Sequence, residues 1–128
     1  MPENVRVLTV DDHLPFLRVA HEVIEATPGF EPAREVSSGA EALALADALD
    51  PDLTLIDVNM PEMSGVEVAR RLKQARPAKL VVLISSTDPG ELPPSVRTCG
   101  ADAVVRKQDL GPALLRRLMR ADGPGENA

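Results

Sequence analysis

Aromatic residues are nearly absent from this sequence, which has two phenylalanines and neither tryptophan nor tyrosine in 128 residues. Stacking of nucleic-acid bases on aromatic rings is therefore disfavoured as a mode of binding. The core has to come from Val, Leu, Ile and Ala instead, and these residues are abundant. At this length the chain suits one compact domain, because a second core would lack material.

Cysteine and long apolar runs are also scarce. Cys99 is the single cysteine, so no intramolecular disulfide is expected. No apolar run approaches the ~20 residues that cross a bilayer, and the N-terminus lacks the basic flank and apolar stretch of a signal peptide. These absences predict a protein that works in the reducing cytoplasm without a membrane anchor.

Positive charge is in the minority, with 14 Lys and Arg against 20 Asp and Glu, a net charge of −6. Short basic pairs such as Arg116–Arg117 do not offset it, so direct binding to nucleic acid or to an acidic membrane is disfavoured. Residues 122–128 are Gly, Pro and polar residues, which predicts a flexible C-terminal tail after a domain of residues 1–121. No output domain is recognisable after it.

Five short apolar runs predict β-strands, and most are nearly continuous, as is typical of strands covered on both faces. They alternate with segments of helical period. This alternation predicts an α/β fold with a doubly wound, five-stranded parallel sheet and flanking helices. The predicted strands are Val5–Val10, Phe30–Val36, Leu53–Asp57, Leu80–Ser85 and Ala103–Arg106.

Four of the segments outside the strands predict amphipathic helices. The second and third helices open with Ser38 and Ser64, each followed three residues later by Glu, as in a capping box. The segment 88–99 contains three prolines and a glycine. Proline disrupts helices from within, so we expect at most a short or irregular fourth helix from Pro94 onward.

Charged and polar residues gather where the predicted strands end. Asp11 and Asp12 follow the first strand. Asp57, Ser85 and Lys107 lie at the ends of the third, fourth and fifth strands. In parallel sheets these ends share one edge, where ligands bind. Neighbouring carboxylates repel by roughly 1 kcal/mol per pair in water and more when desolvated, so a cation is expected among them. Oxygen ligands suit Mg²⁺.

The order and spacing of these residues resemble the receiver domains of two-component response regulators over nearly the whole chain. The opening motif is most similar to NarL-type receivers, which usually continue into a DNA-binding helix-turn-helix. The resemblance implies the flavodoxin-like receiver fold. The matching motifs are Val10–His13, Asp57–Pro61, Gly65, Ser85 before a small residue, and Gly100–Asp102 leading to Lys107.

The same resemblance implies a role for each residue of the cluster. Asp57 would accept a phosphoryl group from a phosphohistidine of a sensor histidine kinase or phosphotransfer protein. Ser85 and Lys107 would hold the phosphoryl oxygens. The ligands of Mg²⁺ would be Asp11, Asp12, Asp57 and the backbone carbonyl of Asn59. Phosphoryl transfer depends mainly on positioning and charge neutralisation, which these groups supply.

Several positions leave alternatives open. Ser86 is adjacent to Ser85, and a slip of one residue at the strand end would exchange the two. His13 is interpreted as the residue that opens the first helix rather than as a metal ligand or phosphorelay site. Most receivers have an aromatic residue where this chain has Val104, and many have proline where it has Gln108. The resemblance therefore does not explain how the signal is transmitted.

The predicted function is that of a single-domain response regulator, not an enzyme, which signals to a downstream protein by changing shape. Slow self-dephosphorylation and a weak homodimer are left open. One alternative is a phosphohydrolase, which typically needs a second carboxylate two residues after the nucleophile, where this chain has Asn59. Another is a phosphate-independent binding module of the same fold. The sequence names neither the kinase nor the output partner.

Overall fold

The computed structural model describes residues 4–121, which form five parallel strands with helices between them. The strand order is β2-β1-β3-β4-β5. The doubly wound sheet is therefore confirmed, and all five strands have the predicted bounds. Residues 122–128, the predicted tail, lie outside the described residues. In chain order the elements are β1 (Val5–Val10), α1 (Leu14–Ala26), β2 (Phe30–Val36), α2 (Gly39–Leu49), β3 (Leu53–Asp57), α3 (Gly65–Ala75), β4 (Leu80–Ser85), the 3₁₀ turn η1 (Pro89–Glu91), α4 (Ser95–Thr98), β5 (Ala103–Arg106), the 3₁₀ turn η2 (Lys107–Asp109) and α5 (Pro112–Ala121).

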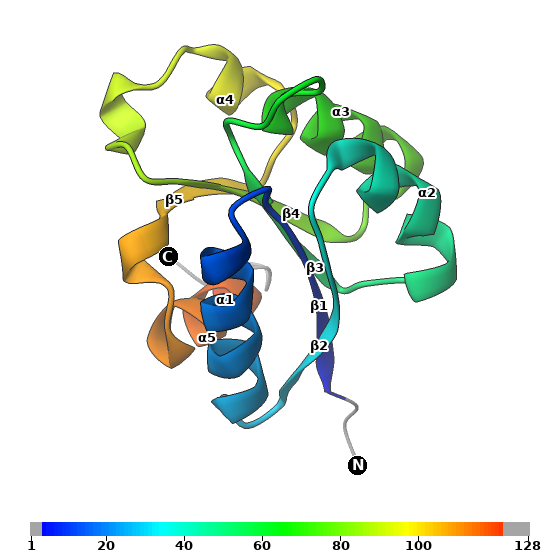
Figure 1. Ribbon diagram of the computed structural model, residues 1–128, viewed down its shortest axis with the longest axis vertical. Helices are drawn as coiled ribbons and strands as arrows, with labels where there is room; N and C mark the ends of the chain where they lie inside the picture. Colours follow the sequence, from blue (N-terminus) through cyan, green and yellow to red (C-terminus); the bar gives the residue numbers. More distant parts are fainter. Residues whose placement is uncertain (1–3, 122–128) are drawn as a thin grey trace.

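Helices cover both faces of the sheet (Figure 1). α1 and α5 lie over one face, and α2, α3 and the short α4 lie over the other. Each face has its own hydrophobic core. Ile24 and Leu115 are buried on the α1 and α5 side, whereas Val68 and Leu83 are buried on the opposite side. β3 and β4 are buried along their whole length, which explains their continuous apolar runs.

Serine side chains determine where α2 and α3 begin. The Oγ atom of Ser38 accepts a hydrogen bond from the backbone N–H of Glu41 (3.1 Å). The Oγ atom of Ser64 accepts one from the backbone N–H of Glu67 (3.3 Å). Each bond satisfies an N–H of the first turn and stabilises the helix by about 1 kcal/mol. The predicted caps are therefore confirmed.

The connection between β4 and β5 is irregular, as its prolines predict. It contains the 3₁₀ turn η1 and the four-residue helix α4. Proline cannot donate a backbone hydrogen bond and clashes with the preceding turn, so a longer helix does not form here. Val96 and Cys99 are the buried residues of segment 86–99. Few apolar contacts therefore hold this segment on the sheet.

The edge strand β2 pairs with β1 through an irregular register. Val7 lies opposite Pro32, but Leu8 lies opposite Arg34, so Ala33 is an extra residue in β2. Proline lacks the N–H that a regular ladder requires, and such interruptions are tolerated at the edge of a sheet. The apolar pattern predicted the strand but not this irregularity.

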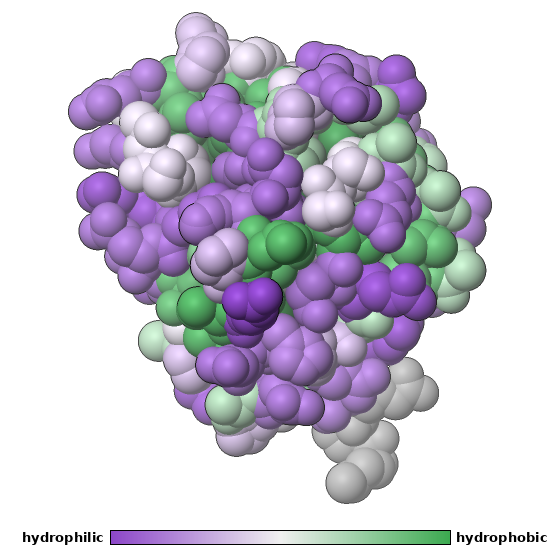
Figure 2. All heavy atoms as spheres, viewed as in Figure 1, coloured by the Kyte–Doolittle hydropathy of each residue, from purple (hydrophilic) through white to green (hydrophobic). Residues whose placement is uncertain are grey.

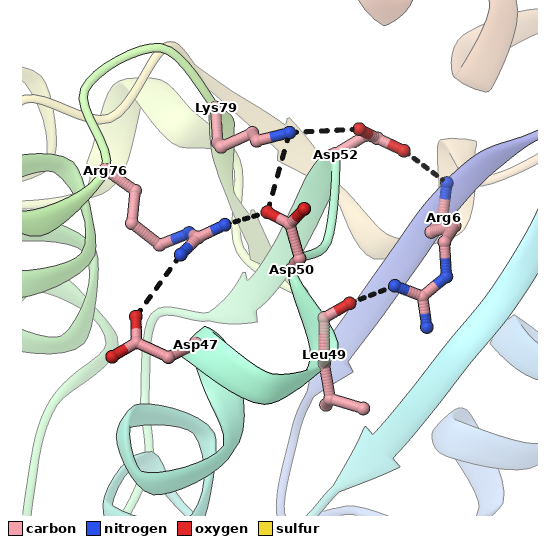
Figure 3. Close-up of polar contacts among 7 residues, drawn as sticks. All are labelled: Arg6, Asp47, Leu49, Asp50, Asp52, Arg76 and Lys79. Atoms are coloured by element: carbon pink, nitrogen blue, oxygen red, sulfur yellow. Dashed lines mark hydrogen bonds and ion pairs between the residues drawn. The ribbon is translucent and has the colours of Figure 1, made fainter.

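At the edge of the sheet where the strands begin, side chains of alternating charge connect neighbouring elements (Figure 3). Arg76, at the end of α3, contacts Asp50 and lies 3.2 Å from Asp47. Lys79 lies 3.6 Å from Asp50 and 3.2 Å from Asp52. The Asp52 carboxylate also accepts a hydrogen bond from the backbone of β1 (2.9 Å). Exposed ion pairs are weak one by one, but this network connects α2, α3 and three strands.

Hydrophilic residues dominate the face of the molecule in Figure 2, and hydrophobic residues gather near its centre. Leu14 and Val19 on α1 are large hydrophobic residues with 55% and 52% of their surface exposed. Leu14 lies in the first turn of α1, close to the edge where the strands end. None of the helices in residues 4–121 has the length and apolar character needed to cross a membrane.

Candidate functional site

Three carboxylates meet at the edge of the sheet where β1 and β3 end. Val10 and Ile56 are partners in register, so Asp11 and Asp57, which follow them, emerge side by side. With Asp12 they form a group in which one oxygen of each carboxylate lies within 4.8 Å of the others. The sequence predicted this cluster, and the parallel register explains why it forms.

Asp11 is fully buried and has two partners. Its Oδ1 atom accepts a hydrogen bond from the backbone N–H of His13 (2.9 Å), which holds the turn from β1 into α1. Its Oδ2 atom forms an ion pair with Lys107 at 2.6 Å. Asp12, by contrast, is exposed. His13 is the N-cap residue of α1, which confirms its interpretation as a helix-opening residue.

Lys107 lies among the carboxylates and next to an aromatic ring. Its Nζ atom is 2.6 Å from Oδ2 of Asp11 and 3.7 Å from Oδ1 of Asp57. The same atom lies over the ring of Phe16, 4.7 Å from its centroid. The sequence predicted Lys107 at this edge but not Phe16. The pattern along a helix shows which face is apolar, not which residue of another element a ring will contact.

The pKa of Asp57 is raised from 3.8 to about 6, mainly because the carboxyl group is buried. The Asp11 carboxylate contributes to this rise, whereas the Lys107 ammonium and a hydrogen bond from the backbone of Asn59 limit it. The charged form of Asp57 is therefore less favourable than that of an exposed aspartate, and additional positive charge would stabilise it. The three carboxylates offer hard oxygen ligands, which fit Mg²⁺.

The other predicted site residues lie next to Asp57 in the fold. Ser85 ends β4 and is buried, and its Oγ atom accepts a hydrogen bond from the backbone N–H of Thr87 (2.9 Å). Ser86 is exposed. Because Ser85 is buried at the strand end and Ser86 is not, Ser85 is favoured as the hydroxyl of the site. Asn59 contributes its backbone N–H to the Asp57 carboxylate.

Gly65 allows the loop after β3 to return close to Asp57. Its N–H donates a hydrogen bond to the carbonyl of Val58 (3.0 Å). A Cβ atom at this position would lie 2.0 Å from the carbonyl oxygen of Asp57. No other amino acid fits so close to the backbone. This glycine therefore allows the end of β3 and the start of α3 to pack together.

Similar proteins identify the family. The family model of the response regulator receiver domain matches residues 7–119. NarP and NarL, two nitrate/nitrite response regulators of Escherichia coli, are 32% and 33% identical to this chain over 98% and 97% of its length. The chain covers 59% and 57% of those proteins, so it spans little more than half the length of these relatives.

Solved structures agree with this match. The signal receiver domain of NarL from Mycobacterium tuberculosis is 28% identical, with a TM-score of 0.84 over 94% of this chain and 98% of that chain. A receiver domain from Methanospirillum hungatei, 24% identical, has the same fold, with a TM-score of 0.80 over 94% of each chain. The matched region includes every residue of the carboxylate site. The chain therefore belongs to the response regulator receiver domain family of two-component signalling.

Proposed function

We propose that this chain is a response regulator receiver domain that accepts one phosphoryl group on Asp57. The observation that carries the proposal is the buried Asp57 carboxylate, next to Asp11 and 3.7 Å from the ammonium of Lys107. The proposed receiver domain comprises residues 1–121. Cys99 is a buried free thiol, which suits the reducing cytoplasm in which we propose that the domain works.

Mg²⁺ is the proposed cofactor. The residues that would hold it are Asp11, Asp12, Asp57 and the backbone carbonyl of Asn59. They fit this ion because the donors are all oxygens and because Lys107 alone leaves the three carboxylates under-neutralised. When bound, the ion neutralises charge on the phosphoryl oxygens.

In the proposed reaction, a carboxylate oxygen of Asp57 attacks the phosphorus of a phosphohistidine on the donor protein. The new P–O bond forms as the P–N bond breaks, and the electron pair of the broken bond leaves with the imidazole, which then takes up a proton. Lys107 and Ser85 would donate hydrogen bonds to the transferred phosphoryl oxygens. Water would later hydrolyse the acyl phosphate slowly and restore Asp57.

A sensor histidine kinase or phosphotransfer protein is the proposed donor. It has to place its histidine at the edge where the strands end, next to the first turn of α1. Leu14 is exposed there, and a shallow groove beside it is lined by Leu17, Arg18, His21 and Glu22. An apolar centre with a charged rim is typical of protein interfaces. The net charge of −6 favours a protein over nucleic acid as the downstream partner.

The two alternative functions have less support. A phosphohydrolase would need a general acid or base near the nucleophile, and Asn59 cannot supply a carboxylate. A phosphate-independent module would have no use for a lysine held among buried carboxylates. We therefore propose a phosphoacceptor rather than an enzyme that turns over.

Intact-mass spectrometry with acetyl phosphate and Mg²⁺ tests the proposal. We expect one phosphoryl group on the wild type and none without the metal. Asp57→Asn should abolish labelling because an amide is a poor nucleophile. Asp47→Asn, an exposed carboxylate at the opposite edge, is the control and should be labelled normally. A wild type that binds Mg²⁺ but stays unlabelled would refute the function, and labelling of Asp57→Asn would refute the choice of acceptor.

A further inference from the structure

The ring of Phe16 lies next to Lys107. The proposed transfer reaction gives this ring no role. An ammonium within about 6 Å of a ring centroid is attracted by the negative face of the ring. The Nζ atom of Lys107 is 4.7 Å from the centroid of Phe16. The lysine side chain is 18% exposed, so water screens this attraction less than at an open surface.

The partners of Lys107 differ in how permanent they are. Asp11 and Asp57 hold the ammonium in the metal-free protein, at 2.6 and 3.7 Å. Both carboxylates are also the groups that would bind the cation, and Asp57 would carry the phosphoryl group. Binding of the cation and attachment of the phosphoryl group would each compete for the carboxylate oxygens that contact Lys107. Phe16 has no polar atom for which a cation or phosphate could compete, so its contact with the ammonium would matter more as the carboxylate partners of Lys107 change.

Neighbouring backbone and side chains hold the ring of Phe16 in place. Phe16 lies in the first turn of α1, where its backbone N–H donates a hydrogen bond to the carbonyl of His13 (3.0 Å). The backbone of His13 in turn donates to Asp11, so this turn is tied to the site itself. The Phe16 side chain is partly buried and packs against the core beneath α1 and α5. Its ring is therefore a fixed surface for a flexible lysine.

We propose that Phe16 is a positioning residue for phosphoryl transfer, whose ring keeps the Lys107 ammonium in the site while its carboxylate partners change. This inference rests on the proposed function of Asp57. It predicts that removing the ring slows transfer without weakening the binding of Mg²⁺, because Phe16 contacts the lysine and not the metal ligands.

NMR of the metal-free protein tests the contact itself. Ring current should shift the side-chain methylene signals of Lys107 upfield relative to those of Lys73 and Lys79. Phe16→Leu, which keeps an apolar side chain, should abolish the shift, and Phe16→Tyr, which keeps a ring, should preserve it. Phe30→Leu, the same change at the other phenylalanine of the chain, is the matched control and should leave the shift intact. An unshifted Lys107 in the wild type would overturn the proposal.

Phosphorylation by acetyl phosphate at saturating Mg²⁺ tests the role. A cation–π contact of ordinary strength predicts that Phe16→Leu is labelled roughly tenfold more slowly. Phe16→Tyr should restore the rate, and Phe30→Leu should not change it. The affinity for Mg²⁺ should agree within about twofold among all four proteins if the site geometry is intact.

The outcomes separate this proposal from the proposed function. If the wild type is not labelled at all, the function of Asp57 fails, while the NMR experiment still tests the contact. If the wild type is labelled and Phe16→Leu is equally fast, Phe16 has no positioning role. Loss of Mg²⁺ affinity in Phe16→Leu would also overturn it, because the ring would then support the whole site.

Discussion

Burial of Asp57 makes the stability of the metal-free protein depend on pH. The pKa of Asp57 is about 6 in the folded protein, above the ordinary aspartate value of 3.8 that applies to the unfolded chain. The folded state therefore holds the proton more tightly than the unfolded state. This contribution to stability is present below about pH 4 and is lost as the pH rises through about 6. We predict that the free energy of unfolding of the wild type, relative to Asp57→Asn, falls by up to about 3 kcal/mol between pH 4 and pH 7. Thermal melts in EDTA measure it.

Two comparisons sharpen this prediction. Asp47→Asn removes an exposed carboxyl group, so its melts should follow those of the wild type. Saturating Mg²⁺ should remove most of the pH dependence, because a bound cation favours the charged carboxylate. Parallel stability curves for the wild type and Asp57→Asn in EDTA would show that Asp57 has an ordinary pKa.

Among single residues, the charged members of the site were predictable from the sequence, but their neighbours were not. Asp11, Asp57 and Lys107 each lie where an apolar run ends, so the strand pattern alone placed them at one edge. Phe16 meets Lys107 only because α1 packs beside the loop after β5, and no local pattern contains that distance. The choice between Ser85 and Ser86 likewise depended on which of the two is buried.

Among the elements, the loop from β3 to α3 depends on the close approach at Gly65. A Cβ atom there would lie 2.0 Å from the carbonyl oxygen of Asp57, and backbone cannot swing away as a flexible side chain can. We predict that Gly65→Ala lowers the free energy of unfolding by roughly 1–3 kcal/mol and slows phosphorylation by displacing Asp57. Thermal melts and labelling with acetyl phosphate measure the two effects.

Gly90 in η1 provides the matched control for this substitution. A Cβ atom there would meet only Oδ1 of Asp88, at an ordinary 3.5 Å, and the N–H of residue 90 would still donate to that carboxylate. Gly90→Ala should therefore resemble the wild type in both measurements. If Gly65→Ala were as benign as Gly90→Ala, the loop would have room that this structure does not show.

The bounds of the elements were more predictable than the contacts between them. Apolar runs marked all five strands because each strand is covered on at least one face, and the prolines of segment 88–99 predicted the short α4. The irregular pairing at Pro32 and the contact of Arg6 with the carbonyl of Leu49 were not predictable. Both depend on which elements become neighbours, which no single segment encodes.

Across the whole molecule, some regions are anchored more firmly than others. The ends of α2 and α3 are connected to the sheet by the ion pairs of Arg76 and Lys79 (Figure 3). Segment 86–99 has only two buried side chains, so its local opening should cost little free energy. Val104 has no ring to rotate between a buried and an exposed position. We therefore expect the signal to leave the site through segment 86–99, which follows Ser85 directly.

Hydrogen exchange measures this difference. With Mg²⁺ and beryllofluoride, a mimic of the phosphoryl group, we predict that the protection of residues 86–99 changes more than that of α1 and α2. The same experiment on Asp57→Asn is the control and should show no such change. A response confined to residues 58–65 would place the output on another surface.

The irregular pairing at Pro32 also bears on self-association. An exposed edge strand offers unpaired backbone groups to a second chain, and proline or charged side chains at the edge make such pairing unfavourable. β2 has both, since Pro32 lies between Glu31 and Arg34. At the other edge, β5 is only four residues long and ends with Arg106. The irregular, charged edge strand β2 and the short edge strand β5 thus disfavour the edge-to-edge pairing of sheets that leads to aggregation.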